Sequence, residues 1–528
     1  MLFTPRIHRG IYLLGLVAAL CALPYSVYVL SVGIIVIVSN WILEGNWEYK
    51  INRIKTSKSL WTFGLIYTSI LIGFFYSKDL REALIELRFW LPLLLVPLVV
   101  ATSSPLKKVE VFFLLILFCL SVFITTIISL SLYLRDYSLL GQNVRYLSPF
   151  ILHIRLALMV NVSFFSLIYL ASGEGFYKSI IVKSALLVMA AWFLVYLYML
   201  QSLTGIVVII LVSTVLLFRW TLLSTKKGLR FSLIIGLTLF VVGSFLYVSG
   251  TSNRYFQRQK IDFKNLPKVT VNGNEYSHDT INKQYENGYL VGINICIPEL
   301  RKGWEKLSKL PFEGNDKANQ SLKLTLIRYL TSKGLTKDSV GLAKLDSIDV
   351  RLIENSVSSV VFRNNKGGIY PRLYQLYWEV DTYINQGIVG GSSVVQRYVY
   401  TKASWSIIKN NFFFGVGTGD RRASLVQYYK TANLNLPEMY WLNSHNQYLT
   451  VWIASGLIGL FLFLSGMLLP FFYDKRFKDF MCLAFLLICL ISMFSIDLLD
   501  KHIGVSFFAL FYAIFFFGDR TQLDEFDK

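Results

Sequence analysis

Charged residues are scarce in this chain. Only 16% of its 528 residues are Asp, Glu, Lys or Arg, whereas 54% are hydrophobic. A soluble protein devotes about a quarter of its residues to charge and interrupts its apolar residues at regular intervals. Here the apolar residues form unbroken blocks long enough to cross a bilayer, for which a helix needs roughly 20 residues. The composition excludes an ordinary soluble domain and predicts a polytopic membrane protein.

Motifs for metals, nucleotides and disulfides are also missing. Of the five cysteines only Cys296 lies outside the apolar blocks, so the polar part of the chain cannot form an internal disulfide. The chain has no CxxC pair, no Asp-x-Asp in its first predicted external loop and no Gly-x-x-x-x-Gly-Lys sequence. These absences argue against metal-dependent lipid-phosphosugar transferases and against nucleotide motors, and we expect neither a metal nor a cofactor.

The net charge of +20 would suit a nucleic-acid partner, but the placement of the basic residues favours another explanation. Many of them lie in short loops between apolar blocks, for example Lys50, Arg53, Lys55 and Lys58. This is the pattern of the positive-inside rule. No zinc-finger spacing, helix-turn-helix signature or ribonucleoprotein motif accompanies them. We therefore expect membrane lipids, and no nucleic acid, among the partners.

The apolar blocks predict about twelve transmembrane helices. They lie near residues 11–24, 26–44, 60–76, 84–102, 109–134, 150–171, 179–200, 204–221, 231–248, 446–470, 479–496 and 502–518. The first block runs directly into the second and lacks a convincing cleavage site, so we interpret it as a retained helix. Almost every basic short loop falls on one side of this alternation, which predicts that both termini are cytoplasmic.

The same blocks divide the chain into four parts. They are an N-terminal transmembrane bundle of about nine helices at 1–248, a large periplasmic loop at 249–444, C-terminal transmembrane helices at 445–518 and a cytoplasmic tail at 519–528. A loop this long between membrane helices usually forms a lid, a binding surface or a small domain. The predicted fold class is an all-α, polytopic membrane bundle with one large external loop domain.

Two stretches hold the candidate chemistry. The first begins at Gln396 with Q-R-Y-V-Y and ends in G-V-G-T-G-D at Asp420; the second begins S-H-N-Q-Y-L and ends in G-L-I-G-L. The three glycines of the first stretch form a flexible turn that could bring backbone amides close to an anion. Taken alone, the turn is more simply explained as a loop that closes a helix.

The combination of these motifs resembles the O-antigen ligase and polymerase superfamily. It joins an arginine on a helix, the Gly-Val-Gly-Thr-Gly turn, and His-Asn-x-Tyr-Leu opening a membrane helix that contains Gly-Leu-Ile-Gly. Residues 76–79 with 91–94 look like the family's early external turn and helix. Residues 328–335, with Lys337 and Asp338, look like an insertion of ligase-like members from Bacteroidetes, the group that this chain resembles most. The implied architecture is a GT-C-like helical bundle.

The resemblance implies an integral, metal-independent membrane glycosyltransferase. Ligases of this kind move a polysaccharide from an undecaprenyl-pyrophosphate carrier to a hydroxyl of lipid A-core at the outer face of the bacterial inner membrane. The sequence leaves three alternatives open: a repeat-unit polymerase, a protein O-oligosaccharyltransferase, and a non-enzymatic transporter of the lipid-linked glycan. The insertion favours the ligase over the polymerase.

The resemblance also assigns roles to residues. His445 is the candidate catalytic base or hydroxyl-orienting group, because histidine suits proton transfer near neutral pH. Arg397 is assigned to the pyrophosphate, because a guanidinium makes planar, permanently charged contacts with phosphate. The residues expected to bind substrate are Arg145, Arg155, Gly415, Gly417, Gly419, Asp420, Arg421, Arg422 and Asn446. The plainer alternatives are a helix cap for His445 and Asn446, surface ion pairs for the arginines after the turn, and a snorkelling side chain for Arg155.

Two positions depart from the family pattern. Many members carry an arginine where this chain has Leu203, and an acid often stands where it has Ala454. Leucine cannot bind phosphate, so we expect Arg155 or a loop arginine to replace the missing cation, or else a different donor or a weakened activity. Asp497, Asp500, Lys501 and His502, at the last predicted external turn, are expected to be structural.

Overall fold

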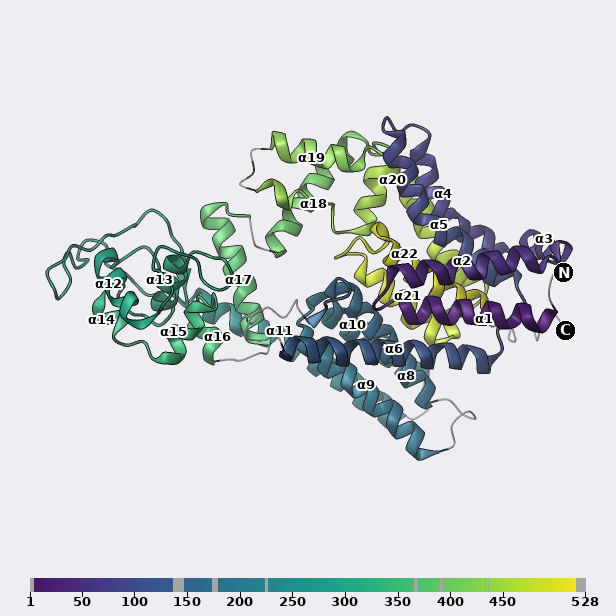
Figure 1. The fold of residues 1–528 in the computed structure, drawn as a ribbon, viewed down its shortest axis with the longest axis horizontal. Helices are drawn as coiled ribbons and strands as arrows, with labels where there is room; N and C mark the ends of the chain where they lie inside the picture. The colour runs from purple at the N-terminus through teal and green to yellow at the C-terminus, as the bar shows by residue number, and fades with distance from the viewer. Residues whose placement is uncertain are drawn as a thin grey trace.

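The chain folds almost entirely into helices. The computed structural model describes residues 4–135, 147–172, 179–223, 227–364, 369–389, 393–432, 434 and 436–518. Within these ranges the strands are confined to one two-stranded antiparallel sheet, formed by β1 (Tyr285–Glu286) and β2 (Tyr289–Leu290). The predicted all-α class is confirmed (Figure 1).

Each predicted apolar block coincides with a helix. These helices are α1 (Pro5–Ala22), α2 (Val27–Glu44), α4 (Lys58–Phe74), α5 (Leu80–Thr102), α6 (Lys108–Arg135), α8 (His153–Ser172), α9 (Ile180–Leu200), α10 (Leu203–Leu223), α11 (Lys227–Phe256), α20 (Gln447–Tyr473), α21 (Phe480–Ser492) and α22 (His502–Tyr512). Within the described ranges, eight helices are long and apolar enough to cross a membrane, and three apolar helices are shorter. The chain is therefore a multi-pass membrane protein, as predicted.

One end of the bundle gathers the loops that are predicted to be cytoplasmic. Arg9 on α1 forms an ion pair with Glu110 on α6 and donates to the carbonyl of Ser104 at 2.8 Å. The amide of Leu106 donates to the carbonyl of Gly518, at the end of the last helix, over 2.7 Å. The N-terminal segment, the loop between α5 and α6 and the end of the last helix therefore lie together. This agrees with the predicted alternation of loops across the bilayer. The side of the membrane that this end faces stays a prediction.

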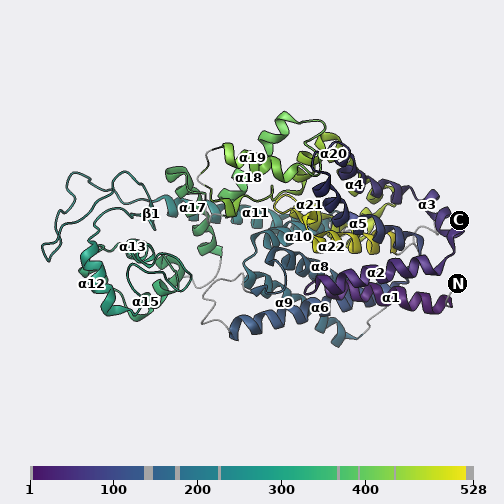
Figure 2. The same ribbon diagram turned by 45° about the horizontal axis from the view of Figure 1, so that its top comes forward.

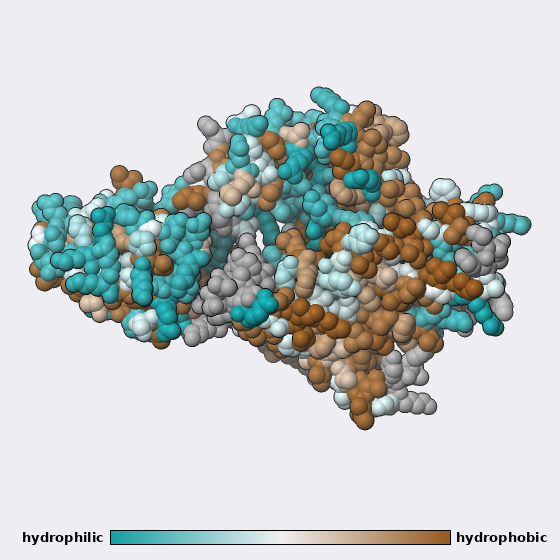
Figure 3. Space-filling model, viewed as in Figure 1, coloured by the Kyte–Doolittle hydropathy of each residue, from teal (hydrophilic) through white to brown (hydrophobic). Residues whose placement is uncertain are grey.

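The opposite end carries the polar segment. Its helices are α12 (Ile297–Leu307), α13 (Leu322–Ser332), α14 (Ser339–Leu342), α15 (Ser347–Glu354), α16 (Val360–Asn364), α17 (Ile369–Gln386), α18 (Ser393–Asn410) and α19 (Arg421–Thr431). Helices α12 to α16 stand apart from the bundle and surround a small core of their own, which includes Trp304, Tyr329 and Ile353 (Figures 1 and 2). Hydrophilic residues dominate the surface of this part, whereas hydrophobic residues cover much of the bundle (Figure 3). We refer to residues 257–364 as the outer domain.

The outer domain is attached through α11 and α17. Helix α11 extends beyond the predicted boundary at 248 and ends at Phe256, where Tyr255 packs against Tyr374 of α17 with ring centroids 5.2 Å apart. The fully buried carboxylate of Glu286 accepts hydrogen bonds from Arg328 and from the Tyr374 hydroxyl. Because a buried charge is tolerated only when it is paired and hydrogen-bonded, these contacts stabilise the junction.

Helix α20 is broken at Gly456, and this break positions the glycine-rich turn. Gly456 has φ 67° and ψ −168°, so the helix loses its regular hydrogen bonds there. The loop after α18 replaces them: the amides of Val416 and Gly417 donate to the carbonyls of Ile453 and Ala454 at 2.8 and 3.0 Å. In return, the amide of Leu457 donates to the carbonyl of Phe412 at 2.9 Å. A broken membrane helix is tolerated where the protein satisfies its freed backbone groups, and residues 412–417 do so here.

We predict that Gly456→Ala destabilises the protein. A methyl group at this position would lie 2.1 Å from the carbonyl oxygen of Phe413, and alanine disfavours a φ of 67°. Strain of this kind costs about 1–3 kcal/mol, which thermal unfolding of the purified protein should show as a lower melting temperature. Gly64→Ala on α4 is the matched control, because nothing lies within 4 Å of its added methyl group. Equal melting temperatures for the two variants would contradict this account of the break.

Candidate functional site

His445 and Arg397 come together although 48 residues separate them in the sequence. His445 precedes Asn446, the N-cap of α20, and its ring packs against that of Tyr400 on α18, with centroids 5.3 Å apart. Arg397 precedes Tyr400 by three residues and therefore lies one turn away on the same helix. Arg397 is also close enough to act electrostatically on the His445 imidazole. The structure thus places the two predicted catalytic side chains at one location.

The backbone of His445 is held in an uncommon conformation. Its φ of 51° lies in the left-handed region, which few residues other than glycine adopt. Its amide donates to the carboxylate of Asp497 at 2.9 Å, and the same carboxylate accepts from the hydroxyls of Ser444 at 3.1 Å and Thr450 at 2.6 Å. Asp497 is buried, so these bonds fix the turn that presents the histidine. A strained residue that is held by its surroundings is typical of functional sites.

The environment favours the neutral imidazole. Burial lowers the pKa of His445 below its ordinary value of 6.5, and the positive charge of Arg397 lowers it further. The carboxylates of Asp497 and Asp500 oppose this shift without reversing it. His445 is therefore uncharged near neutral pH and can accept a proton. Its ring makes no hydrogen bond with any residue in the described part of the chain, which leaves the ring nitrogens available.

Arg397 is a half-buried cation that has no partner within the described ranges. Its guanidinium makes neither a hydrogen bond nor an ion pair with any residue that the structure describes. Burial lowers its pKa, the nearby Arg372 lowers it further, and Glu379 opposes them. Two arginines close together, one without a counter-ion, form an environment that attracts an anion.

Arg421 has a different environment from Arg397. It is 5% exposed, and its Nη2 lies 2.7 Å from a carboxylate oxygen of Glu86 on α5 and 3.1 Å from one of Asp500. Burial opposes the charged form, but these carboxylates outweigh it and raise the pKa of Arg421. The ion pairs tie α19 to α5 and to the turn before α22. Arg422, the next residue, is exposed.

Two further arginines, Arg155 and Arg145, were predicted to bind substrate. Arg155 is the third residue of α8. Its side chain is half-buried and lies close enough to Asp497 and Asp500 for their charges to act on it. It therefore belongs to the same charged network as His445. Arg145 lies outside the described residues.

The glycine-rich turn is fully engaged with the protein. The amide of Gly415 donates to Asn411, those of Val416 and Gly417 donate to α20, and that of Gly419 donates to the hydroxyl of Ser77 at 3.0 Å. Gly415 and Gly417 have φ values of 74° and 105°, and a methyl group at Gly419 would lie 2.0 Å from the carbonyl oxygen of Asp79. In this conformation these amides are used by the protein, and the glycines permit close packing. Their predicted role in substrate binding stays a prediction.

Asp420 and Asn446 likewise make local structural contacts. The carboxylate of Asp420 accepts from the amides of Lys78 and Asp79 at 2.7 and 3.2 Å, which joins the turn to the loop after α4. The side chain of Asn446 accepts from the amides of Tyr448 and Leu449 and so caps α20, the simpler of the two roles considered for it. Any contact of either residue with substrate stays a prediction.

The sequence predicted a structural role for Asp497 and Asp500, in the turn before α22, but not their neighbours. Asp497 accepts from the His445 amide, and Asp500 pairs with Arg421. Both carboxylates also bear on the charge of His445. The available signal was the pair of acids three residues apart at the mouth of a membrane helix, where charges are costly and usually functional.

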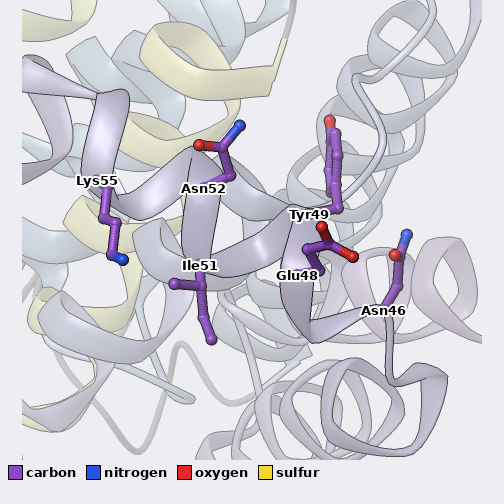
Figure 4. A pocket seen from close by; sticks show the side chains of 6 residues that line it. All are labelled: Asn46, Glu48, Tyr49, Ile51, Asn52 and Lys55. Carbon is purple, nitrogen blue, oxygen red and sulfur yellow. The ribbon is translucent and has the colours of Figure 1, made fainter.

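A hollow of about 570 Å³ lies elsewhere, on α3 (Trp47–Thr56) (Figure 4). Its lining residues are Asn46, Glu48, Tyr49, Ile51, Asn52 and Lys55. Helix α3 packs against α5 at one side of the bundle, whereas α18, whose Tyr400 contacts the His445 ring, lies at the other side (Figure 1). The hollow therefore has no part in the site around His445.

Fold and site together define a multi-pass, all-α membrane protein with a buried charge network at the mouth of its helices. Residues 359–464 match the family model described as O-antigen ligase. The match runs from α16 into the broken helix α20 and contains both Arg397 and His445. It confirms the resemblance to the O-antigen ligase superfamily and supports a ligase- or polymerase-like function in general. No curated protein matches the chain.

Proposed function

We propose that this protein transfers a polysaccharide from an undecaprenyl-pyrophosphate carrier to a hydroxyl of lipid A-core at the outer face of the inner membrane. The observation that carries the proposal is the convergence of Arg397 with the neutral imidazole of His445 inside the segment that matches the O-antigen ligase model. The reaction needs a cation for the leaving pyrophosphate and a base for the acceptor hydroxyl, and the site offers both.

The proposed transfer is a single displacement. His445 accepts the proton of the acceptor hydroxyl as its oxygen attacks the anomeric carbon of the donor. The bond between that carbon and the phosphate oxygen breaks, and its electron pair leaves with the carrier pyrophosphate. Arg397 binds the pyrophosphate as negative charge develops on the leaving oxygen, where a preorganised donor is most effective. The proton on His445 then passes to solvent.

Arg155 is proposed as the cation that replaces the family arginine missing at Leu203. Asn161, on the same helix as Arg155, donates to the carbonyl of Gly205 at 3.0 Å, so α8 packs against the start of α10 where Leu203 lies. The hydroxyl of Thr204 lies 3.1 Å from that of Ser495, two residues before Asp497. The turn with the missing arginine, the start of α8 and the carboxylates near His445 are therefore neighbours, and a cation from α8 can serve the same region.

The lipopolysaccharide gel profile of cells that carry a single altered copy tests the proposed function. Under the proposal, His445→Ala removes the whole polysaccharide ladder while lipid-linked chains accumulate, with the protein level in the membrane unchanged. If single repeats still reach the core and only long chains vanish, the reaction is repeat-unit polymerisation. An unchanged profile rejects both reactions and leaves protein glycosylation and transport as the alternatives.

The pH dependence of transfer is expected to follow the imidazole of His445. The base works only when it is neutral, so kcat/KM should fall as the pH drops through the pKa of His445, with a midpoint below 6.5. Asp497→Asn keeps an oxygen for the His445 amide but removes a charge that raises this pKa, so the midpoint should move to lower pH. A profile of kcat/KM against pH for both proteins measures this shift. A midpoint that stays in place would contradict the electrostatic role of Asp497.

A further inference from the structure

Helix α18 has two faces of different character. The face that carries Val399, Tyr400 and Ala403 is buried against the rest of the protein. The other face carries Tyr398, Lys402, Trp405 and Lys409, whose spacing of four, three and four residues places them in one stripe. Tyr398 is 55% exposed and Trp405 43% exposed, and both lysines are exposed.

The stripe continues into three consecutive phenylalanines. Phe412, Phe413 and Phe414 begin two residues after the end of α18 and are 38%, 60% and 63% exposed. They are not loosely attached, because the indole nitrogen of Trp452 on α20 donates to the carbonyl of Phe412 at 3.1 Å. The ring of Trp452 also meets that of Trp405 edge to face, with centroids 5.6 Å apart. We call the seven residues the α18 aromatic surface; they are Tyr398, Lys402, Trp405, Lys409, Phe412, Phe413 and Phe414.

The depth of this surface follows from its backbone bonds. Phe412 and Phe413 accept from the amides of Leu457 and Ile458, beyond the break in α20 and therefore inside a membrane-spanning helix. At a rise of about 1.5 Å per residue, this point lies roughly 15 Å along α20 from its start at Gln447. The phenylalanines therefore lie at the level of the outer part of the bundle.

The surface also meets the end of a span, because the hydroxyl of Tyr76, just after α4, donates to the carbonyl of Phe414. Phe75, just after α4, is 77% exposed, and Phe461 on α20 is 69% exposed. In Figure 3 the hydrophilic surface over α18 and α19 passes into hydrophobic surface over α4 and α5. Such a contiguous patch with a polar rim marks an interaction site. Its composition is typical of a membrane interface, where tyrosine and tryptophan gather at the headgroup level and lysine pairs with lipid phosphates.

We propose that the α18 aromatic surface is embedded in the outer-leaflet interface of the bilayer, with Phe412 to Phe414 among the acyl chains and Lys402 and Lys409 at the phosphates. Helix α18 then lies on the membrane, although it belongs to the long polar segment between spans. Its buried face, which carries Arg397 and Tyr400, is held directly above the lipid surface. The inference concerns only the position of α18 and does not depend on the proposed reaction.

Spin labels on the full-length protein in lipid nanodiscs test this position. Cys21→Ser removes the half-buried cysteine, and the other four cysteines are buried, so single labels can be placed through Phe413→Cys and Tyr398→Cys. Val271→Cys is the matched control, because Val271 is 86% exposed on the outer domain. The measurement is the collision rate of each label with oxygen, which concentrates in lipid, relative to a water-soluble nickel chelate.

The expected result is an oxygen-to-nickel ratio several-fold higher at 413 than at 271, with an intermediate ratio at 398. Equal ratios at 413 and 271 would show that the surface faces water and would overturn the proposal. Low collision rates with both reagents at 413 would also overturn it, because they would show that a protein or a second copy of the chain covers the surface. If Phe413→Cys does not fold, a second measurement replaces it: the quenching of tryptophan fluorescence by brominated lipid, compared between the wild type and Trp405→Phe. The quenched fraction should be smaller in Trp405→Phe, because the proposal places Trp405 in lipid. Unchanged quenching would overturn the proposal.

Discussion

Replacing His445 is expected to lower the rate of glycan transfer by about 10²–10⁴-fold, the usual contribution of a positioned general base. His445→Asn is the sharper variant, because asparagine tolerates the left-handed φ of 51° better than alanine and cannot serve as the base. The backbone bond to Asp497 remains in this variant. The loss should appear in kcat, measured with purified protein, lipid-linked donor and acceptor.

The control for this prediction is a measurement of whether the variant protein is still folded. The His445 ring forms no hydrogen bond with described residues, so the melting temperature of His445→Asn should stay close to that of the wild type. Wild-type kcat in His445→Asn would remove the base from the mechanism. A loss of activity together with a large drop in melting temperature would instead assign His445 a structural role.

The second large effect is expected at Arg397. Removing one preorganised donor from a developing negative charge costs about 10²–10³-fold in kcat, and Arg397→Ala should show a loss of this size. Arg397→Lys should recover only part of it, because an ammonium group cannot make the planar, two-pronged contact of a guanidinium. The loss should fall mainly on kcat, because the charge on the leaving pyrophosphate develops in the transition state.

The chain provides a matched control for Arg397. Arg351 on α15 is an exposed arginine of the outer domain and belongs to no predicted site, so Arg351→Ala should leave kcat near the wild-type value. Similar losses of kcat in the two variants would show that transfer depends on the net positive charge of the protein and not on one positioned guanidinium. A loss confined to KM in Arg397→Ala would place Arg397 in general substrate binding.

The sequence predicted the helices well and the break in α20 poorly. Long apolar blocks are sufficient to place membrane helices, because the bilayer demands continuous backbone hydrogen bonding. The same blocks cannot show that Gly456 departs from helical geometry, because Gly-Leu-Ile-Gly is compatible with an ordinary membrane helix. The break depends on residues 412–417, which supply the replacement hydrogen bonds from a distant part of the chain.

The sequence pointed to Arg397 and His445 as candidate site residues, but it did not show which residues contact them. Arg397 and His445 were selected through the resemblance of their motifs, and the structure brings them together. The carboxylates of Asp497 and Asp500 come from a turn 52 to 55 residues beyond His445, so no local pattern could connect them with it. The amides of the glycine-rich turn bond to partners on α4 and α20 that only the fold reveals, and the expected contact of the turn with substrate stays a prediction.

Reconstituted transfer tests the central claim most directly. Purified protein in liposomes is given undecaprenyl-pyrophosphate-linked polysaccharide and lipid A-core, and the joined product is quantified beside the His445→Asn variant. The proposed function predicts polysaccharide on lipid A-core with the wild type and at least about 100-fold less product per unit time with the variant. Equal product from both proteins, or none from a folded wild-type protein, would contradict it.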